Sequence, residues 1–461
     1  MASPHLEHIP ASYKDPAGFV YKKDGVIYRQ INTIAQKDFD LLLESGLYKD
    51  LVSRNHLIRH EAVPLSKKAT DDAYAVVKPE QITFISYPYE WSFSQLKDAA
   101  LLTLEVQKIA LEYGMSLKDA SAYNVQFRNN KPILIDTLSF ETYNQGKPWV
   151  AYRQFCQHFL APLALAAYID LRFLPLQRQY LDGYPLDFVS RLLPRRTLLN
   201  LGLSMHIHAH AKSQSHFADK KTSTTKSVSI SLTALRGILE NLTNTVGNLK
   251  LPRSSSEWGD YYDVTNYTET SFHNKKKLIE QFVKKTMPST VLDLGANTGE
   301  FSRAAAQYAT FVISTDYDLP AVEKNYALAK KNQEDNILPL VLDVTNPSSA
   351  QGWAGAEREG FFSRGSFDMI LALALIHHLV ITFNLPLKSV SEFLAQQTTY
   401  LIIEFVPKED SQVQKLLQNR EDIFPDYHTE GFEKAFMKNF KIIKKEPVLQ
   451  SKRTLYLFKS L

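Results

Sequence analysis

The sequence predicts an α/β protein whose C-terminal half forms a doubly wound parallel sheet, preceded by an α+β domain. The main observation is the run Val291–Gly299, in which a short apolar strand breaks at glycines into a helical pattern from Glu300. A second apolar strand, Phe311–Ile313, follows that helix and leads to Asp316. Strands that alternate with helices in this way favour a parallel sheet with helices on both faces.

The same alternation continues to the C-terminus. We expect helices at 231–246, 275–283, 300–308, 320–332 and 386–397, and strands at 290–294, 310–315, 337–342, 367–371, 399–405, 440–443 and 454–458. Asp318 and Pro320 are typical of the first turn of the 320–332 helix, as its cap and its first-turn proline.

The N-terminal half mixes strands and helices, as an α+β domain does. Asp24-Gly25 between two apolar runs predicts a two-residue hairpin. Apolar periodicity then indicates a helix at about 36–46, a strand at 82–87, a long amphipathic helix at 93–113 and a largely helical stretch at 150–169.

A polar stretch divides the chain. Residues 211–227 are rich in Ser, Thr and Lys and nearly devoid of apolar side chains, which is typical of a linker. We therefore expect an N-terminal domain at 1–210 and a C-terminal domain at 228–461.

Composition excludes several classes of protein. At 461 residues and 44% apolar, the chain is long enough for two globular domains. A net charge of +4 is too weak to indicate nucleic-acid binding, and the longest basic run, Lys275–Lys277, is typical of a solvated helix face. The longest apolar run, Phe159–Ile169, is too short to span a bilayer, and the N-terminus lacks a signal pattern. We expect a cytoplasmic protein with no membrane partner.

The chain has one cysteine, Cys156, so a disulfide within the chain or a cysteine-rich metal site is excluded. Its aromatic neighbours Phe155 and Phe159 favour a buried structural thiol. A catalytic cysteine pair of the kind that methylates RNA carbon is excluded for the same reason.

The glycine turn predicts a ligand site. A strand that breaks at glycines into a helix brings backbone N–H groups and a helix N-terminus up to a ligand. Asp316 ends the second strand 21 residues after Gly295. An acid at about that distance usually holds a ribose diol.

From about residue 271 to 461 the chain resembles a class I S-adenosylmethionine (SAM)-dependent methyltransferase. Four elements in order carry the resemblance: Asp293–Gly299, Asp316, Leu342–Val344, and Phe367–Ala372 running into Ile376–Leu379. The glycine pattern is GxxxG rather than the GxGxxG of a dinucleotide site, which favours SAM over NAD. The resemblance implies a Rossmann-like fold, an antiparallel last strand and SAM as the cofactor.

The glycine turn and the first two strand ends would hold the amino acid and ribose parts of that cofactor. The backbone from Gly295 to Gly299 would pass close to the amino acid moiety, and Asn297 can donate and accept inside the loop. Asp293 can orient the loop or meet the ligand ammonium. Asp316 can accept both ribose hydroxyls, although a helix cap or a surface acid is the alternative.

The next strand end would serve the adenine. Asp343 could accept from the adenine amino group, and Val344 could offer its backbone N–H to a ring nitrogen. Tyr317 and Leu319 could sandwich the ring, although Tyr317 could equally be a packing residue.

Ala372 ends the fourth strand and leads into His377 and His378 at the edge where ligands bind. Neighbouring residues do not share a helix face, so we expect one histidine to point inward and one to be exposed. Either histidine could be a base for the acceptor or a polar contact near the sulfonium, and the alternative is a histidine that fixes the loop. No metal is expected, because the spacing supplies no further ligands.

The acceptor stays open, as a small molecule or a protein. Glu404–Pro407 is expected to help line its pocket, because it follows the fifth strand. Trp258, Tyr261, Tyr262 and Tyr267 could fold over the donor as a lid or pack at the domain seam. An Asn-Pro-Pro-Tyr segment, typical of methylation at an amide or base nitrogen, is absent from the sequence.

A second constellation lies in the N-terminal half. Asp119, Asn124 and Asp136 follow the spacing by which kinase-like phosphotransferases place a base and two magnesium ligands. The sequence departs from that pattern: it has no glycine-rich loop, Arg29 stands where a strand lysine is expected, and Thr137-Leu138 replaces Phe-Gly. The resemblance therefore implies a degenerate kinase-like fold, and a turn and a strand end in an unrelated α+β domain are the alternative.

His206, His208 and His210 alternate, and on a strand they would share one face. Because they lack acidic partners, we expect an exposed strand or helix end rather than a metal site.

The sequence as a whole predicts transfer of a methyl group from SAM to an acceptor by in-line displacement. Together, the two halves are similar to bacterial methyltransferases labelled nodulation-protein-like, a label that defines no substrate. A kinase-like phosphotransferase and a SAM-binding module without catalysis are the alternatives.

Overall fold

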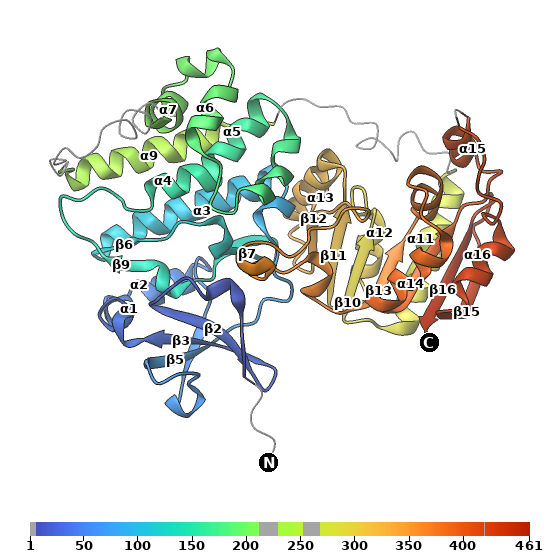
Figure 1. Cartoon of the computed structure of the whole chain (residues 1–461), viewed down its shortest axis with the longest axis horizontal. Coiled ribbons are helices and arrows are strands. Elements are labelled where there is room, and N and C mark those ends of the chain that lie inside the picture. The colour runs from blue at the N-terminus through green and yellow to red at the C-terminus, as the bar shows by residue number, and fades with distance from the viewer. Residues whose placement is uncertain (1–5, 212–228, 252–267, 419) are drawn as a thin grey trace. The chain divides into compact units, whose positions relative to one another are not determined.

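The computed structural model describes residues 6–211, 229–251, 268–418 and 420–461. The chain forms two compact units (Figure 1). One is Met1–Arg253 with Ala350–Glu359, and the other is Ser254–Ser349 with Gly360–Leu461. Each unit has its own sheet.

The units divide later in the chain than the sequence analysis expected. The predicted linker, 211–227, lies outside the described residues except at its first position. Helix α9 (Leu232–Asn248) packs on α3 (Phe93–Glu112), and its Asn241 Oδ1 lies 2.8 Å from His206 Nε2. The apolar stripe of α9 is therefore buried in the N-terminal unit, not in the C-terminal domain to which its sequence position had assigned it.

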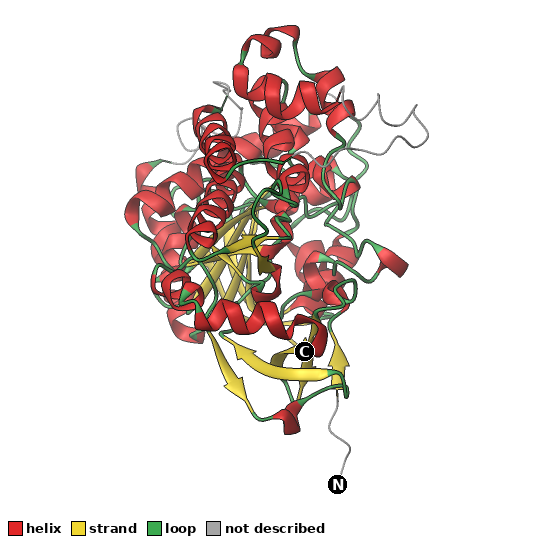
Figure 2. Ribbon diagram, turned by 90° about the vertical axis from the view of Figure 1, so that its left-hand side faces the viewer, coloured by secondary structure: helices red, strands yellow, loops and turns green. Residues whose placement is uncertain are grey.

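The N-terminal unit begins with a five-stranded antiparallel sheet, whose strands are the yellow arrows near the N-terminus in Figure 2. In the order β1-β2-β3-β5-β4, the strands are β1 (Leu6–His8), β2 (Gly18–Lys23), β3 (Val26–Asn32), β5 (Ala73–Pro79) and β4 (His60–Val63). Asp24 and Gly25 join β2 to β3 with φ of 53° and 80°, as a tight hairpin turn requires. The predicted hairpin is confirmed.

The segment 82–87 is irregular, so the predicted strand there was wrong. Side chains accept from the backbone N–H groups of Ser86 and Tyr87 in this segment. The Ser86 N–H donates to Gln126 Oε1 at 2.9 Å, and the Tyr87 N–H donates to Glu90 Oε2 at 2.9 Å. An apolar run alone does not specify strand pairing.

Helices and two short strand pairs complete this unit. The helices are α1 (Gln36–Glu44), α2 (Leu47–Ser53), α3, α4 (Tyr152–Phe155), α5 (Ala161–Tyr168), α6 (Leu186–Leu192), α7 (Leu201–Leu203) and α9. The strand pairs are β6 (Met115–Leu117) with β9 (Phe140–Thr142), and β7 (Val125–Arg128) with β8 (Lys131–Leu134). The predicted helices at 36–46 and 93–113 are confirmed as α1 and α3.

Cys156 lies in a buried π-helical turn between α4 and α5, as the sequence analysis expected of a buried thiol. Burial raises the pKa of the thiol far above its ordinary value, so the group is a neutral packing residue. Among the described residues, α5 and every other helix are too short or too polar to cross a bilayer.

The C-terminal unit is built on a seven-stranded sheet. In the order β12-β11-β10-β13-β14-β16-β15, the strands are β12 (Ile337–Val341), β11 (Phe311–Asp316), β10 (Thr290–Leu294), β13 (Phe367–Ala372), β14 (Thr398–Phe405), β16 (Thr454–Ser460) and β15 (Phe440–Pro447). Neighbouring strands from β12 to β14 are parallel, and β16 is antiparallel to both of its neighbours. The predicted doubly wound sheet and its antiparallel last strand are confirmed.

The helices of this unit connect its strands. They are α11 (Glu269–Thr286), α12 (Glu300–Ala306), α13 (Leu319–Asn332), α14 (Leu387–Gln397), α15 (Ser411–Leu417) and α16 (Thr429–Phe436). Apolar side chains of α11 and α12 pack on β10 and β13 in one buried core, in which Ile279, Val291 and Met369 are fully buried. Parallel strands place their carboxyl ends at a common edge of the sheet. The predicted site residues lie at or just after these strand ends.

Candidate cofactor and acceptor site

The turn after β10 has the backbone that its glycines predict. Gly295, Asn297 and Gly299 all have positive φ, at 75°, 53° and 85°. The N–H groups of Gly295 and Ala296 donate to Thr315 O, which ties the turn to the end of β11. A Cβ at Gly299 would lie 2.4 Å from the side chain of Asn325, so glycine is required there for close packing as well as for its conformation.

Asp316 faces this turn. Its Oδ2 accepts a hydrogen bond from Asn297 N at 2.8 Å, and its Oδ1 accepts one from Asp318 N at 2.9 Å. Burial raises the pKa of Asp316 to about 6. Because each carboxylate oxygen has a second lone pair, both oxygens can still accept from a hydroxyl group. The structure therefore brings the strand-end acid and the glycine turn together.

Asp293, at the end of β10, is buried with one oxygen in use. Its Oδ2 accepts from the Ser302 hydroxyl at 2.6 Å, whereas its Oδ1 is buried and has no hydrogen-bond partner among the described residues. Burial raises the pKa of Asp293 to about 7. A buried acceptor without a donor is costly, and a ligand donor such as an ammonium group fits it.

The high pKa of Asp293 gives a testable pH dependence. The folded state holds a proton that the unfolded state releases near pH 4, so stability falls as the pH rises from about 4 to 7. Asp293→Asn removes this titration. We expect the free energy of unfolding of the wild type, relative to that of the variant, to fall by up to roughly 1.4 kcal/mol for each pH unit crossed. Urea unfolding of both proteins at pH 5 and pH 8 measures this, and a pH-independent difference would contradict it.

The residues predicted to hold an adenine follow β11 and β12. The Tyr317 side chain is 56% exposed, which is compatible with a ring that covers a ligand. Asp343 is exposed, and its Oδ1 accepts from both the N–H and the hydroxyl of Thr345, at 2.9 and 2.6 Å. Asp343 thus stabilises a local turn, while Val344 beside it is half-buried.

Ala372 is buried at the end of β13, and the two histidines follow it. His377 is 2% exposed, whereas His378 is half-buried, and their ring centroids are 4.2 Å apart. The expectation that one ring points inward and one is exposed was therefore wrong. Residues 378–382 form a π-helical turn rather than a regular helix, and His377 is the residue before it.

Both histidines are neutral at pH 7. Burial, with the nearby charge of Arg453, lowers the pKa of His378 to about 4 and holds the pKa of His377 well below its ordinary value. His377 Nδ1 is buried without a hydrogen-bond partner among the described residues. A neutral imidazole can accept a proton from an acceptor atom, so the protonation state suits the predicted base.

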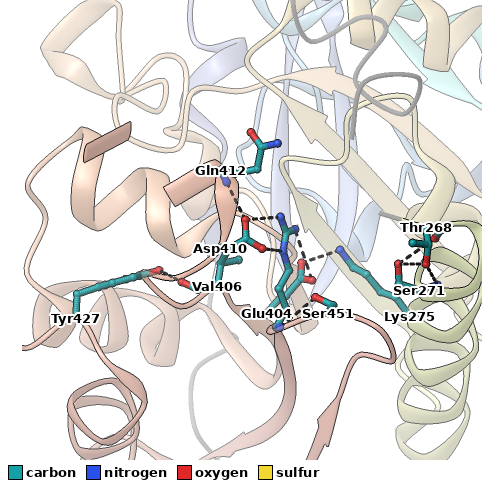
Figure 3. Close-up of polar contacts among 10 residues, drawn as sticks. Thr268, Ser271, Lys275, Glu404, Val406, Asp410, Gln412, Tyr427 and Ser451 are labelled. Carbon is teal, nitrogen blue, oxygen red and sulfur yellow. Dashed lines mark hydrogen bonds and ion pairs between the residues drawn. The ribbon is translucent and has the colours of Figure 1, made fainter. Parts of the chain in front are cut away.

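A buried group of charges at the end of β14 was not predicted from the sequence (Figure 3). Lys275 Nζ donates to Glu404 Oε2 at 2.7 Å, and Arg453 Nε donates to Asp410 Oδ2 at 2.8 Å. Arg453 also lies 3.9 Å from Glu404 Oε1, which joins the two pairs. We call Lys275, Glu404, Asp410 and Arg453 the buried charge cluster.

Two expectations are corrected by this cluster. The sequence predicts that Lys275 and its basic neighbours form a solvated helix face. In the structure Lys275 is 1% exposed, and its Nζ lies 4.4 Å from the centroid of the Phe301 ring. Glu404 was expected to line the acceptor pocket, but it is fully buried against Lys275. The signal for Lys275 is its helical spacing from Ile279 and Phe282, which places it on the apolar stripe of α11.

The kinase-like residues are also brought together, within the N-terminal unit. Asn124 Nδ2 donates to Ser139 Oγ at 3.1 Å, and Ser139 Oγ donates to Asp136 Oδ2 at 2.6 Å. Burial and the charge of Asp136 raise the pKa of Asp119. However, Arg29 forms an ion pair with Asp136, so a cation already neutralises the predicted magnesium ligand. The described residues contain no group of three or more His, Cys, Asp or Glu that could hold a metal.

The alternating histidines are not on an exposed strand. His206 and His208 are buried in a π-helical turn after α7, so that expectation was wrong. His206 bonds to Tyr152 and Asn241, and His208 bonds to Ser190 and Thr197, so polar side chains satisfy both rings. The four aromatic residues that were considered as a lid lie outside the described residues: Trp258, Tyr261, Tyr262 and Tyr267.

The strand order, the antiparallel seventh strand and the glycine turn after the first strand define a class I methyltransferase-like Rossmann fold in the C-terminal unit. No family model matches the chain. A whole-length relative is nodulation protein NoeA of Rhizobium meliloti (strain 1021), which is 37% identical over 469 residues and matches 99% of this chain and 97% of its own. The chain belongs to the NoeA family.

Solved structures resemble parts of the chain. The N-methyltransferase NodS from Bradyrhizobium japonicum WM9 is 12% identical, and the match covers 42% of this chain and 97% of NodS with a TM-score of 0.32. WbdD is 18% identical, with 43% of this chain and 42% of WbdD covered and a TM-score of 0.32. NodS is also solved in complex with S-adenosyl-L-homocysteine.

Proposed function

We propose that the C-terminal unit binds SAM and transfers its methyl group to an acceptor. The observation that carries this proposal is the meeting of a positive-φ glycine turn, the strand-end acid Asp316 and the unsatisfied Asp293 Oδ1 at the carboxyl edge of the sheet. A positive-φ glycine turn and carboxylate acceptors at adjoining strand ends suit a nucleoside with a cationic amino acid end.

Each part of the cofactor has residues that suit it. Asp316 would accept the ribose hydroxyls, and Asp293 Oδ1 would accept from the ammonium group, directly or through water. The backbone from Gly295 to Gly299 would approach the amino acid moiety. Tyr317, Asp343 and Val344 would be placed at the adenine.

When bound, SAM supplies a methyl group on a sulfonium that carries its own driving force. The contribution of this chain is to align the reactants and exclude water, which can lower a barrier by about 7–11 kcal/mol at best. His377 and His378, both neutral, would take a proton from an acceptor atom bound after β13. The name of NoeA assigns that relative to nodulation, and we propose that this chain serves the same process.

The experiment is a methyl-transfer assay of the intact protein with methyl-labelled SAM and a panel of small-molecule and protein acceptors. Label in an acceptor, lost in the double variant His377→Asn/His378→Asn, supports an enzyme in which the histidines take part. If SAM binds but every acceptor stays unlabelled, a SAM-binding module without catalysis replaces the proposed enzyme.

A further inference from the structure

One surface of the N-terminal unit exposes large apolar side chains beside arginines. The exposed apolar residues lie within fifteen positions of one another in the sequence: Leu192, Leu198, Leu199, Leu201 and Met205. Arg191, Arg195 and Arg196 in the same stretch are also exposed. We call these eight residues the tip patch. They lie on α6, α7, the turn between these helices and the π-helical turn after α7, and α6 and α7 are labelled in Figure 1.

Between residues 197 and 201, the usual burial of apolar side chains and exposure of polar ones is reversed. Thr197 is buried, and its hydroxyl lies 2.9 Å from Nε2 of the buried His208, whose Nδ1 lies 2.8 Å from Ser190 Oγ. By contrast, Leu199 and Leu201 are 87% and 81% exposed. In folded proteins, leucine side chains are normally buried and hydrogen-bonding side chains are normally exposed, because each fully buried leucine contributes favourably to folding. Between residues 197 and 201, the chain therefore buries Thr197 and exposes Leu198, Leu199 and Leu201.

The backbone that carries the exposed Leu201 is held in place by close packing and a helix cap. Gly202 lies so close to α9 that a Cβ there would be 1.9 Å from Thr245 Oγ1. Asn200 Oδ1 accepts from Leu203 N at 3.0 Å and caps α7, and Leu203 is fully buried. The backbone on both sides of Leu201 is therefore held, so its outward position follows from the fold.

The charge around the leucines is positive. Between residues 186 and 211 the sequence contains one acid, Asp187, and its carboxylate lies 2.5 Å from Arg191. The guanidinium carbon of Arg196 lies 5.7 Å from the centroid of the Tyr168 ring, within the range of a cation–π contact. Arg195 completes a cationic rim beside the apolar side chains.

We propose that the tip patch binds the surface of an anionic phospholipid bilayer, with its leucines at the boundary of the headgroups and acyl chains and its arginines on lipid phosphates. Leucines beside arginines are typical of segments that lie in a membrane interface. Three exposed arginines against the single acid of this stretch, Asp187, favour an anionic surface as the partner. The expectation of no membrane partner rested on the short apolar runs and the lack of a signal pattern, neither of which bears on a patch at a folded surface. The proposal is independent of methyl transfer.

The test is co-sedimentation of the full-length protein with vesicles of phosphatidylcholine, with and without one third phosphatidylglycerol. We expect the wild type to sediment with the anionic vesicles and to be released by high salt. Leu199→Ser/Leu201→Ser should lower the partition coefficient about tenfold or more, because two apolar side chains are lost. Arg195→Gln/Arg196→Gln should lower it by about fivefold for each arginine.

A matched control separates this patch from general surface hydrophobicity. Ile34→Ser/Leu65→Ser removes two other exposed apolar side chains, which are 75% and 49% exposed, and should leave the partition coefficient unchanged. Thermal unfolding should be alike in all four proteins. The proposal is overturned if the wild type does not sediment with anionic vesicles, or if Leu199→Ser/Leu201→Ser sediments as well as the wild type. Concentration-dependent dimers that this variant abolishes, without vesicle binding, would instead assign the patch to a second copy of the chain.

Discussion

Replacing Lys275 by methionine is expected to destabilise the C-terminal unit by about 3–5 kcal/mol. The Lys275 ammonium lies 2.7 Å from a carboxylate oxygen of Glu404, and both side chains are buried. Methionine fills a similar volume but leaves the Glu404 charge with Arg453 as its nearest cation in the buried charge cluster, at 3.9 Å. Urea unfolding measures the change, and hydrogen exchange of the β14 amides reports this unit separately from the other.

Lys276→Met is the matched control. Lys276 is the next residue of α11, but its side chain is about one third exposed and lies 3.6 Å from Glu300. Its loss should change the free energy of unfolding by less than about 1 kcal/mol. Adding Glu404→Gln to Lys275→Met should recover part of the lost stability, because the uncompensated charge is removed. Equal effects of the two lysine substitutions would contradict the buried ion pair.

Asp316→Ala is expected to weaken SAM binding by about 1–3 kcal/mol, or roughly five- to 150-fold in Kd. The substitution would leave two buried ribose hydroxyls without their acceptor. It would also free Asn297 N, to which Asp316 Oδ2 is bonded at 2.8 Å, so part of the loss would come from the glycine turn. Isothermal titration calorimetry of both proteins with SAM measures the difference.

Asp335→Ala is the control for that measurement, because Asp335 is an exposed acid of the same unit. The affinity of the Asp335→Ala protein for SAM should equal that of the wild type. If Asp316→Ala lowers the melting temperature but leaves the Kd for SAM unchanged, Asp316 positions the glycine turn and does not hold the ribose.

Local patterns predicted the C-terminal sheet and the position of the site. The turn from Gly295 to Gly299 needs positive φ, which short-range sequence reveals, and an acid at a strand end must lie at the edge of a parallel sheet. Asp316 and Asp293 could therefore be placed from their neighbours in the sequence. The orientation of His378 could not, because it depends on a π-helical turn.

Features that depend on distant partners were missed or misplaced. The buried position of Lys275 depends on Glu404, which is 129 residues away in the chain. The assignment of α9 depends on α3, and the burial of His206 depends on Asn241 of α9. For Lys275 and His206, a specific tertiary ion pair or hydrogen bond offsets the cost of burying a polar side chain. The local sequence around one partner does not reveal the other partner.

The central claim is that the C-terminal unit holds a sulfonium nucleoside between its glycine turn and the acid at the end of β11. Calorimetric titration of the intact protein with S-adenosyl-L-homocysteine, and separately with Mg-ATP, tests it most directly. We predict saturable binding of S-adenosyl-L-homocysteine at one site and no heat from Mg-ATP, because Arg29 already neutralises Asp136. Binding of Mg-ATP with no binding of S-adenosyl-L-homocysteine would contradict the account.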